Sequence, residues 1–458
     1  MNDTHHTMQA FELPQSVESI LKTFKDAGFE IFLVGGCVRD LLMERPTKDW
    51  DFTTNATPEE ILKLYPDGFY NNVFGTVGIP TQNSEQIQIY EITTYRTEHG
   101  YTDKRHPDKI SWGKTIEEDL SRRDFTINAI AYNGDQIIDP FGGQEDITNH
   151  LIRAVGEPTK RFEEDALRMM RAVRIATQLT CIIEQETFEA IKKNAHLIEH
   201  ISGERVRDEL FKILSSEFPS DGMMILKNSG LLGEILPELD RCFDIQQLSP
   251  KRHHIYDVGT HLVKSLELAP TKDPLVRLAT LLHDIGKFDT YYKTPEGVIT
   301  FYNHEIVSAA LTREIVDRLR LSRDQREKVI RLVRWHQFTV DERQTDSAIR
   351  RFIRNVGREN LDDMLALRIG DRLGGGARET SWRLELYKKR LEEVQIQPFS
   401  IQDLKVNGYD VMKILDIKPG PQVGKILEAL FKEVEEDKEK NNREYLLKRI
   451  PEISSLQG

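Results

Sequence analysis

The stretch LVGGCVRDLLMERPTKDWDF, residues 33–52, decides how the first part of this chain folds. The apolar run ending at its first two residues predicts a short buried strand, the glycine pair a turn, and CVRDLLM the first turns of a helix. The segment DWDFT, residues 49–53, predicts a second strand, on which Asp49 and Asp51 share a face while Trp50 points into the packing. Two carboxylates this close repel each other unless a cation lies between them, so the stretch predicts a Mg²⁺ site.

The composition is that of a globular protein with several domains. The chain has 458 residues, of which 39% are hydrophobic and 30% charged, and this length predicts about two to four domains. No stretch approaches the roughly 20 apolar residues of a membrane span, and the N-terminus lacks a basic segment followed by an apolar core. Three widely spaced cysteines cannot form a disulfide framework or a zinc cluster. We therefore expect a cytoplasmic protein without membrane partners.

The charge pattern leaves room for nucleic acid. A formal net charge of −12 argues against a generic nucleic-acid coat but does not exclude local basic patches. Residues 311–335 carry eight basic and four acidic side chains, and residues 347–358 carry four arginines and no acid. These segments are either a track for a phosphate backbone or solvated helix faces with i,i+4 ion pairs.

The order of patterns predicts an α+β protein. Residues 1–30 indicate an amphipathic helix, residues 31–140 alternate strand-like runs with turn residues, and 3.6-residue periodicity dominates after about residue 150. We expect a mixed-sheet head over residues 1–150 and then three helical parts. These are a neck over 151–245, a second domain over 246–395 and a tail over 396–458.

The glycine pair is a candidate phosphate site. Gly35 and Gly36 let the backbone approach a ligand at the start of a helix, where free N–H groups attract phosphate. Arg39 lies about one turn further on and could reach the same phosphates. Next to Asp49 and Asp51, this would form a phosphate cradle beside a metal site. A surface strand with two solvated aspartates is the alternative.

Other charged residues of the head could complete such a site. Glu91, in QIQIYEITTYR, is the candidate for a third carboxylate. Arg122 and Arg123, in EEDLSRRDFTINAIAYN, are natural partners of a triphosphate, and Arg123 is the better candidate. Exposed surface charge would explain the same residues without any ligand.

The segment RFEEDALRMMRAVRIA, residues 161–176, predicts a helix that could select a base. On that helix Asp165 and Arg168 would share a face, continued by Arg171 and Arg174, opposite an apolar stripe. A carboxylate accepts from the exocyclic amine of cytosine or adenine while a guanidinium donates to the adjacent ring acceptor, and uracil and guanine would be mismatched. An intrahelical salt bridge is the alternative.

These motifs follow one another in the order and approximate spacing of one family: LVGGCVRDLL, DWDFTTNATPEEI, YEITTYRTEHGYTDKRHPDKISW, EEDLSRRDFTINAIAYN, DPFGGQEDI and RFEEDALRMMRAVRIA. Over about residues 30–180 the chain resembles the bacterial class II CCA-adding enzymes (tRNA nucleotidyltransferases) and the related bacterial poly(A) polymerases. The resemblance implies a polymerase-β-like nucleotidyltransferase head in which Asp49 and Asp51 are catalytic and bind Mg²⁺. It also implies tRNA, CTP and ATP as partners.

The same resemblance implies a nucleotide-binding set: Gly36, Arg39, Arg123, Asp165, Arg168, Arg171 and Arg174. Within this set Asp165 and Arg168 would form a protein template for the incoming base. The loop 97–112 looks intact, and in the family it belongs to the flexible element needed to switch from CTP to ATP. The chain departs from the family pattern at Trp50 and Ile175, neither of which touches a proposed catalytic group.

A second constellation of metal-binding residue types lies between residues 251 and 371: His261, His283, Asp284, His304, His336 and Asp371. An adjacent His-Asp pair on an apolar helix is rare as core, because both groups need partners when buried. The spread resembles the HD phosphohydrolase domain. That resemblance implies His261, His283, Asp284 and Asp371 as ligands of a divalent metal of unknown identity, Mg²⁺ among the possibilities.

In the same resemblance His304 and His336 are additional ligands or acid/base groups. An active site of this type would hydrolyse 2′,3′-cyclic or terminal phosphates, whereas an HD fold can also be purely structural. The tail, residues 403–434, resembles the family's C-terminal region and either holds tRNA phosphates or is a plain helical cap.

The sequence therefore predicts template-independent addition of CCA to the 3′ end of tRNA from CTP and ATP, by two-metal transfer that releases pyrophosphate. Within the same family, an enzyme that adds only A and a poly(A) polymerase stay open. From another class, the chain could act mainly as an HD phosphohydrolase. The sequence leaves the oligomeric state open.

Overall fold

The structure is a computed structural model that describes residues 11–47, 49–70, 75–83, 86–99, 109–247, 256–338, 343–395 and 401–457. Its contacts divide the chain into two compact units. The first comprises residues 1–241 with 318–320, and the second comprises 242–317 with 321–458. Each unit is described by itself, and the four-part division expected from the sequence stays a prediction.

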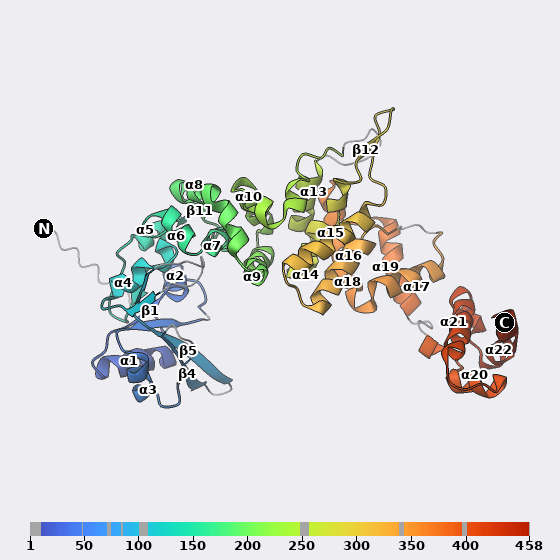
Figure 1. The fold of residues 1–458 in the computed structure, drawn as a ribbon, viewed down its shortest axis with the longest axis horizontal. Coiled ribbons are helices and arrows are strands. Elements are labelled where there is room, and N and C mark those ends of the chain that lie inside the picture. Colours follow the sequence, from blue (N-terminus) through green and yellow to red (C-terminus); the bar gives the residue numbers. More distant parts are fainter. Residues whose placement is uncertain are drawn as a thin grey trace. The chain divides into compact units, whose positions relative to one another are not determined.

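A seven-stranded mixed sheet forms the start of the first unit (Figure 1). Its strand order is β3-β4-β5-β2-β1-β8-β9, and β2 and β5 are parallel whereas the other neighbours are antiparallel. The strands are β1 (Ile31–Val34), β2 (Asp51–Thr54), β3 (Phe69–Tyr70), β4 (Thr76–Asn83), β5 (Gln86–Thr94), β8 (Ala131–Tyr132) and β9 (Ile137–Ile138). This confirms the mixed sheet.

Apolar periodicity explains how the sheet is covered. All four residues of β1 are buried, and α1 (Gln15–Asp26) packs its apolar stripe against Ile31 and Leu33 of this strand. The stripe consists of Val17, Ile20, Leu21 and Phe24. Trp50 is also buried in this core, as expected. After β1 the chain turns at Gly35, whose φ of 77° suits glycine, and enters α2 (Gly36–Leu42).

Helices make up most of the rest of the first unit. They include α4 (Ile116–Ser121), α5 (Gly143–Thr148), α6 (Pro158–Glu164), α7 (Leu167–Leu179), α8 (Gln185–Asn194), α9 (Gly203–Leu214) and α10 (Pro219–Asn228). The short strands β10 (Leu151–Ile152) and β11 (Ile182–Ile183) pair in parallel, which periodicity did not predict. Two-residue strands are too short to leave a pattern.

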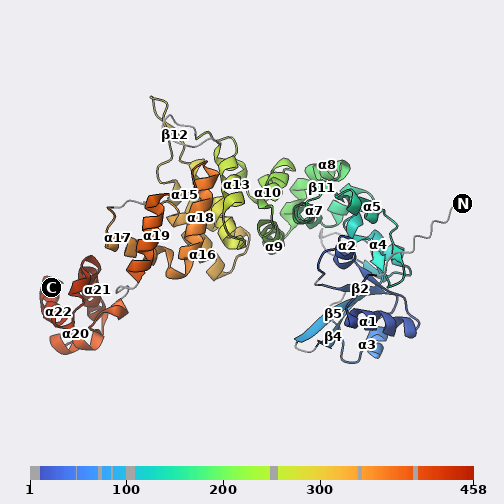
Figure 2. The same ribbon diagram turned by 180° about the vertical axis from the view of Figure 1, so that it is seen from behind.

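In the part of the second unit that the structure describes, the chain is helical apart from one small hairpin (Figures 1 and 2). Its main helices are α13 (Val258–Leu268), α14 (Pro274–Leu282), α15 (His304–Arg318), α16 (Arg323–Trp335), α17 (Asp346–Val356), α18 (Leu361–Gly374), α19 (Trp382–Gln395), α20 (Gly408–Leu415), α21 (Pro421–Glu436) and α22 (Arg443–Gln457). The hairpin joins β12 (Tyr292–Lys293) to β13 (Ile299–Thr300). The architecture confirms the α+β class.

Two glycines bring α18 against α13. A Cβ atom built on Gly370 would lie 2.5 Å from the carbonyl oxygen of Ser265, and one built on Gly374 would lie 2.3 Å from Ser265 Oγ. These distances are shorter than any real Cβ contact, so only glycine permits this approach. The close packing places Asp371 of α18 opposite His261 of α13.

Among the described residues, every helix is too short or too polar to cross a membrane.

Candidate functional site

Three carboxylates of the head gather at one end of β2. The parallel pairing of β2 with β5 sets Asp51 directly opposite Glu91, and opposed residues of neighbouring strands have their side chains on the same face of a sheet. Asp49 precedes the strand by two residues, so the prediction that both aspartates lie on one strand is wrong. The ladder to β5 begins only at Asp51, which leaves Asp49 without a strand partner.

The charge of Asp51 is influenced by its burial and by its charged neighbours. Burial raises the pKa of Asp51 above its ordinary value, and repulsion from Glu91 and Asp49 raises it further. Attraction by the Arg123 guanidinium opposes both effects. A cation bound between these carboxylates would cancel their repulsion and would therefore stabilise the ionised form of Asp51.

The glycine turn brings two arginines to the same place. A Cβ atom on Gly35 would lie 3.1 Å from Arg123 Nη1 and 3.9 Å from Asp51 Oδ2, so the backbone passes close to both groups. Arg39 folds back over Gly36, where a Cβ atom would lie 3.5 Å from its Nη2. Arg123 and Asp51 thus lie beside Gly35, and Arg39 lies beside the neighbouring Gly36.

Each of these arginines is held by a partner that the sequence analysis did not single out. Arg39 donates from Nη1 to Asn128 Oδ1 at 2.8 Å, and Arg123 Nη2 lies 3.2 Å from Asp119 Oδ2. Asp119 also binds Arg122 at 2.6 Å. Its side chain is buried, and the two arginines hold its pKa below the ordinary value against the effect of burial. Asp119 precedes Arg122 and Arg123 by about one helical turn, and this spacing is the sequence signal that could have predicted these ion pairs.

Asp165 does not lie within a helix, which corrects the predicted single helix over 161–176. α6 ends at Glu164, Asp165 is extended with φ −143°, and α7 begins at Leu167. The Asp165 carboxylate accepts a hydrogen bond from the backbone N–H of Leu167 at 3.0 Å, which favours a new helix start over continuation. Periodicity alone could not detect this break.

Asp165 and Arg168 also have different charged partners, so the alternative of an intrahelical salt bridge between them is wrong. Arg205 of α9 holds both oxygens of the Asp165 carboxylate, at 2.8 and 3.3 Å. Arg168 binds Glu164 at 2.6 Å and donates to the carbonyl oxygens of Arg161 and Arg122. Both side chains are therefore fixed independently.

Arg171 and Arg174 lie on α7 as predicted, and each meets a buried acid. Arg171 lies 2.6 Å from Asp124, and Arg174 lies 2.9 Å from Glu209. Burial alone would raise the pKa of Asp124, but the Arg171 guanidinium holds it well below its ordinary value. On the other side of α7 the expected apolar stripe is buried: Leu167, Met169, Met170 and Val173.

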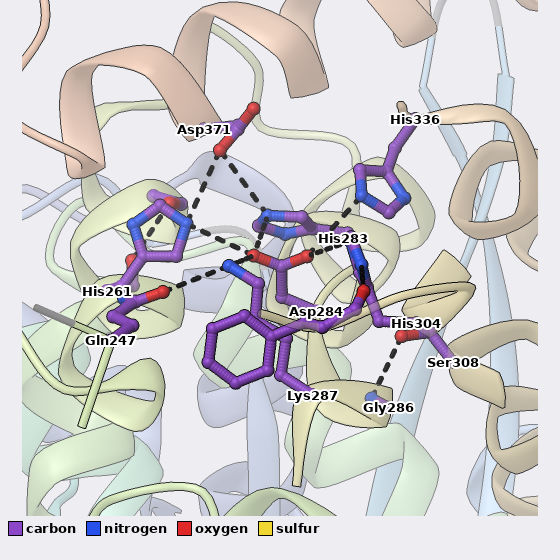
Figure 3. Close-up of polar contacts among 12 residues, drawn as sticks. Gln247, His261, His283, Asp284, Gly286, Lys287, His304, Ser308, His336 and Asp371 are labelled. Atoms are coloured by element: carbon purple, nitrogen blue, oxygen red, sulfur yellow. Dashed lines mark hydrogen bonds and ion pairs between the residues drawn. The ribbon is translucent and has the colours of Figure 1, made fainter. Parts of the chain in front are cut away.

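The six residues of the second constellation meet in one buried cluster (Figure 3). His261 comes from α13, His304 from the first turn of α15 and Asp371 from α18. His283 follows α14 and is followed by Asp284, and His336 follows α16. The predicted grouping of these side chains in space is therefore observed.

The ring nitrogens of this cluster converge on two carboxylates. Asp371 Oδ1 lies 3.3 Å from His261 Nε2 and 3.5 Å from His283 Nε2. Asp284 lies 3.3 Å from His283 Nε2, 3.0 Å from His304 Nε2 and 3.4 Å from His336 Nε2. Ligand atoms of His261, His283 and Asp371 all lie within 4.8 Å of one another, as do those of His283, Asp284 and His336.

Backbone carbonyls fix three of the rings. The Nδ1 atoms of His283, His304 and His336 lie 2.7, 2.8 and 2.7 Å from the carbonyl oxygens three residues earlier. A carbonyl only accepts, so each Nδ1 donates and each neutral ring keeps its lone pair on Nε2. This orientation is the usual support of a metal-binding imidazole.

Neighbouring charges shift the pKa values of His283 and Asp284 within this buried cluster. Burial lowers the pKa of His283, but the adjacent Asp284 and Asp371 outweigh it and raise this pKa to about 10. Burial would raise the pKa of Asp284, but Lys287 and the imidazoles hold it well below its ordinary value. Lys287 Nζ lies 2.6 Å from Asp284 Oδ2 and donates to Gln247 Oε1 at 2.9 Å.

A pocket of about 420 Å³ opens onto the cluster. Asp284, His304, His336 and Asp371 form part of its lining, together with Arg368 and other polar side chains. The volume suits a small ligand, and the charged residues of the lining are the acids Asp284, Glu305 and Asp371 and the bases Lys287 and Arg368.

Ion pairs occupy several of the arginines that were candidates for a phosphate track. Arg323 pairs with Glu327 at 3.1 Å and Arg326 with Asp317 at 2.9 Å. Arg354 pairs with Glu435 of α21.

The ends of loop 97–112 lie in two strands, β6 (Arg96–His99) and β7 (Lys109–Trp112), which pair antiparallel. Residues 100–108 lie outside the described residues.

Three family models match the chain. One described as "Poly A polymerase head domain" matches residues 31–153. One described as "Probable RNA and SrmB- binding site of polymerase A" matches 182–243, and one for domain 2 of tRNA nucleotidyltransferase matches 298–450. The first of these agrees with the polymerase-β-like head expected from the motifs.

Similar proteins extend the match to the whole chain. A CCA-adding enzyme of Limosilactobacillus reuteri is 33% identical over 98% of this chain and 99% of its own length. One of Lactobacillus helveticus is 40% identical over 62% of this chain and 70% of its own. The crystal structure of a Bacillus stearothermophilus CCA-adding enzyme in complex with CTP is 28% identical, with a TM-score of 0.71 over 97% of this chain and 98% of that one. This chain belongs to the family of bacterial CCA-adding enzymes.

Proposed function

We propose that this nucleotidyltransferase adds CCA to the 3′ end of tRNA, using CTP and ATP. The observation that carries the proposal is the site at the glycine turn, where Asp51 lies opposite Glu91 and close to Arg123. Support also comes from the full-length similarity to CCA-adding enzymes and from the matched tRNA nucleotidyltransferase domain. The cytoplasmic location stays a prediction.

The head carboxylates fit divalent cations. Asp49, Asp51 and Glu91 supply oxygen ligands, and mutual repulsion raises the pKa of Asp51. When bound, two Mg²⁺ ions would neutralise charge on the transferring phosphate and lower the pKa of the attacking hydroxyl. Arg39 and Arg123 would hold the triphosphate. The 3′-oxygen of the tRNA forms a bond to the α-phosphorus, the bond to the bridging oxygen of pyrophosphate breaks, and the hydroxyl proton passes to a carboxylate.

Base selection would rest on Asp165 and Arg168. The carboxylate accepts from the exocyclic amine of cytosine or adenine, and the guanidinium donates to the neighbouring ring acceptor. Uracil and guanine would leave both groups without partners, which is costly in a closed site. Arg205 and Glu164 would keep the two groups in place, since each holds one of them by an ion pair.

The test is nucleotide addition to tRNA transcripts that end at the discriminator base, at C and at CC. Each transcript receives CTP, ATP or both with Mg²⁺, and products are read at single-nucleotide resolution. We expect CC followed by one A. If only the transcript that ends in CC is extended, and only by A, the protein would be an A-adding enzyme. A long ladder of added A residues would indicate a poly(A) polymerase. Addition that survives Asp51→Ala would contradict the proposed site.

The second unit supports a second candidate function, a metal-dependent phosphohydrolase. The observation that favours it is the convergence of four Nε2 atoms on Asp284 and Asp371. His261, His283, Asp284 and Asp371 would hold a divalent metal, and their donor set suits a transition metal. When bound, that metal would supply an activated water and neutralise phosphate charge.

In such a hydrolysis, the oxygen of water forms a bond to phosphorus, one phosphorus–oxygen bond breaks and the water proton ends on the leaving oxygen. Calorimetric titration of the metal-free protein with Ni²⁺, Mn²⁺ and Mg²⁺ tests metal binding. We expect a transition-metal site that is lost in His283→Ala and kept in Asp51→Ala. Unchanged metal binding in His283→Ala would contradict the assignment.

A further inference from the structure

A row of paired residues crosses the head sheet from its edge to the proposed catalytic carboxylates. Phe69 of β3 pairs with Gly78 of β4, and Gly78 pairs with Glu91 of β5. Glu91 in turn pairs with Asp51 of β2. Residues that oppose each other on neighbouring strands have their side chains on the same face of a sheet. Phe69 therefore shares a face with Asp51, three strands away from it.

The alternation of burial along β5 shows that this face is the open one. Ile92, which directly follows Glu91, is buried in the core of the head. Successive side chains of a strand point to opposite faces, so Glu91 and Ile89 point away from that core. Ile89 is 53% exposed and Phe69 is 44% exposed. The open face thus carries two large apolar side chains in line with the carboxylates.

A glycine lets the Phe69 ring lean toward these carboxylates. A Cβ atom built on Gly78 would lie 2.6 Å from Cζ, 2.9 Å from Cε2 and 3.1 Å from Cε1 of Phe69. The tip of the ring therefore lies over β4, where any side chain at position 78 would stand. From β4 to Asp51 the distance across the sheet is two strand spacings, about 10 Å, which one nucleoside can bridge.

The two sides of Asp51 differ in their chemistry. On the side of β1, Arg123 and Arg39 lie beside the glycine turn, where the triphosphate is proposed to bind. On the side of β5 lie Glu91 and then the Phe69 ring. The attacking and leaving oxygens of a nucleotidyl transfer lie roughly in line, so the hydroxyl approaches from the side opposite to the leaving pyrophosphate. The acceptor strand therefore belongs on the side of β5, β4 and β3.

We infer that Phe69 binds the 3′-terminal base of the acceptor RNA by stacking and so places the 3′-hydroxyl at Asp51 and Glu91. Ile89 borders the base on β5. Stacking on an aromatic ring is tolerant of sequence, because every base has a π-face. This suits an acceptor whose last base changes with each addition. The inference rests on the nucleotide addition proposed above and gives its second substrate a binding site.

The test is a double-mutant cycle between the ring and the base. Two tRNA transcripts end in C, and in one of them the last nucleotide lacks its base but keeps its 3′-hydroxyl. With CTP and Mg²⁺, Phe69→Leu should lower kcat/KM for the complete transcript about tenfold and leave KM for CTP unchanged. With the abasic transcript, wild type and Phe69→Leu should be equal. Phe69→Trp keeps an aromatic surface and should recover most of the loss.

Each other outcome of the cycle has a defined meaning. An equal loss with both transcripts, or a loss that Phe69→Trp does not recover, would assign the ring a structural role and overturn the inference. No loss in Phe69→Leu would overturn it as well. If the wild-type protein adds nothing to the complete transcript, the proposed nucleotide addition itself fails.

The matched control is Tyr70→Leu. Tyr70 is the next residue of β3, is 47% exposed and pairs with Val77, so its side chain points to the opposite face of the sheet. The change removes an aromatic ring of similar exposure from the same strand. We expect wild-type kcat/KM with both transcripts. A loss as large as that of Phe69→Leu would show that the edge of the sheet, and not the ring on the open face, is responsible.

Gly78→Ala moves the ring without removing it, because the new methyl group would occupy the place of the ring tip. We expect a loss of kcat/KM with the complete transcript and none with the abasic one. Wild-type kinetics with both transcripts would show that the position of the ring over β4 is irrelevant and would overturn the inference.

A second readout works without catalysis. A transcript with 2-aminopurine as its last base is titrated with the full-length protein and Mg²⁺, without any nucleoside triphosphate. Stacking on Phe69 should quench the fluorescence, and Phe69→Leu should bind the transcript without this quenching. If addition fails in the wild type, this titration alone decides whether the ring binds the terminal base. Quenching that persists in Phe69→Leu would overturn the inference.

Discussion

The charge state of Asp51 depends on residues that the β-ladder places around it. Burial and the facing Glu91 raise its pKa, and Arg123 lowers it. Replacing Glu91 by Gln removes a negative charge but keeps the shape of the side chain. The pKa of Asp51 should then fall, because its ionised form is no longer repelled by Glu91.

Carboxyl NMR of the metal-free protein, labelled on aspartate, measures this change, and Asp51→Asn identifies the signal. The expected shift runs toward lower pH. An unchanged titration, or a shift to higher pH, would mean that Glu91 does not face Asp51 and would weaken it as a third ligand. Glu117→Gln, on α4, is a suitable control of equal charge.

At the same scale, Arg205 should determine how well the chain selects a base. It holds both oxygens of Asp165, so Arg205→Ala frees the carboxylate to leave the geometry that recognises cytosine and adenine. We expect kcat/KM for CTP and ATP to fall by about 10- to 100-fold, with UTP and GTP much less affected. Arg205→Lys should recover only part, since an ammonium cannot bind two oxygens in the fork geometry.

Single-nucleotide addition with each of the four triphosphates provides the measurement. Arg207→Ala is the control, because Arg207 lies on the same helix and pairs with Asp208 rather than with Asp165. A uniform loss with all four nucleotides would assign Arg205 a purely structural role.

At the scale of elements, the glycines of α18 set the geometry of the histidine cluster. A methyl group on Gly374 would lie 2.3 Å from Ser265 Oγ and 2.6 Å from its backbone nitrogen, so Gly374→Ala must push α18 away from α13. Because Asp371 lies on α18 and His261 on α13, the substitution should weaken transition-metal binding. It should also cost about 1 to 3 kcal/mol of unfolding free energy.

Calorimetry and urea unfolding measure the two effects. Gly424→Ala on α21 is the control, since nothing lies within 4 Å of the Cβ atom it would introduce. Alanine there should be neutral or stabilising by up to about 1 kcal/mol. Wild-type metal affinity in Gly374→Ala would show that the cluster does not depend on this helix contact.

Elements were predictable from the sequence where their own periodicity determines them. The strand Ile31–Val34, the turn at Gly35 and the helix after it form as expected because apolar order and glycine placement are local signals. The break at Asp165 was not predictable in this way. It depends on a side-chain bond to Leu167 and on Arg205, which is remote in sequence.

The candidate sites likewise depend in part on local sequence signals and in part on contacts between residues that are remote in sequence. Glu91 was a sound candidate, but only the register of β5 against β2 places it opposite Asp51. The cluster of histidines was recognised through a resemblance, since its members come from separate helices and no spacing connects them. Lys287 and Arg368, which bind its two carboxylates, carried no signal that distinguishes them from surface charge.

At the scale of the whole molecule, the two proposed activities should be separable because each site is built within one unit. Asp371→Asn removes one charge of the cluster with little change in shape, so the second unit should still fold while metal binding and phosphate hydrolysis are lost. CCA addition by the same preparation should stay at the wild-type level, and the urea unfolding transition of the variant is the control for folding of the second unit. Asp51→Ala should show the reverse: no addition, but wild-type hydrolysis and transition-metal binding. If Asp371→Asn also abolishes CCA addition while its unfolding transition is unchanged, the two sites act together, and the assignment of one activity to each unit would be wrong.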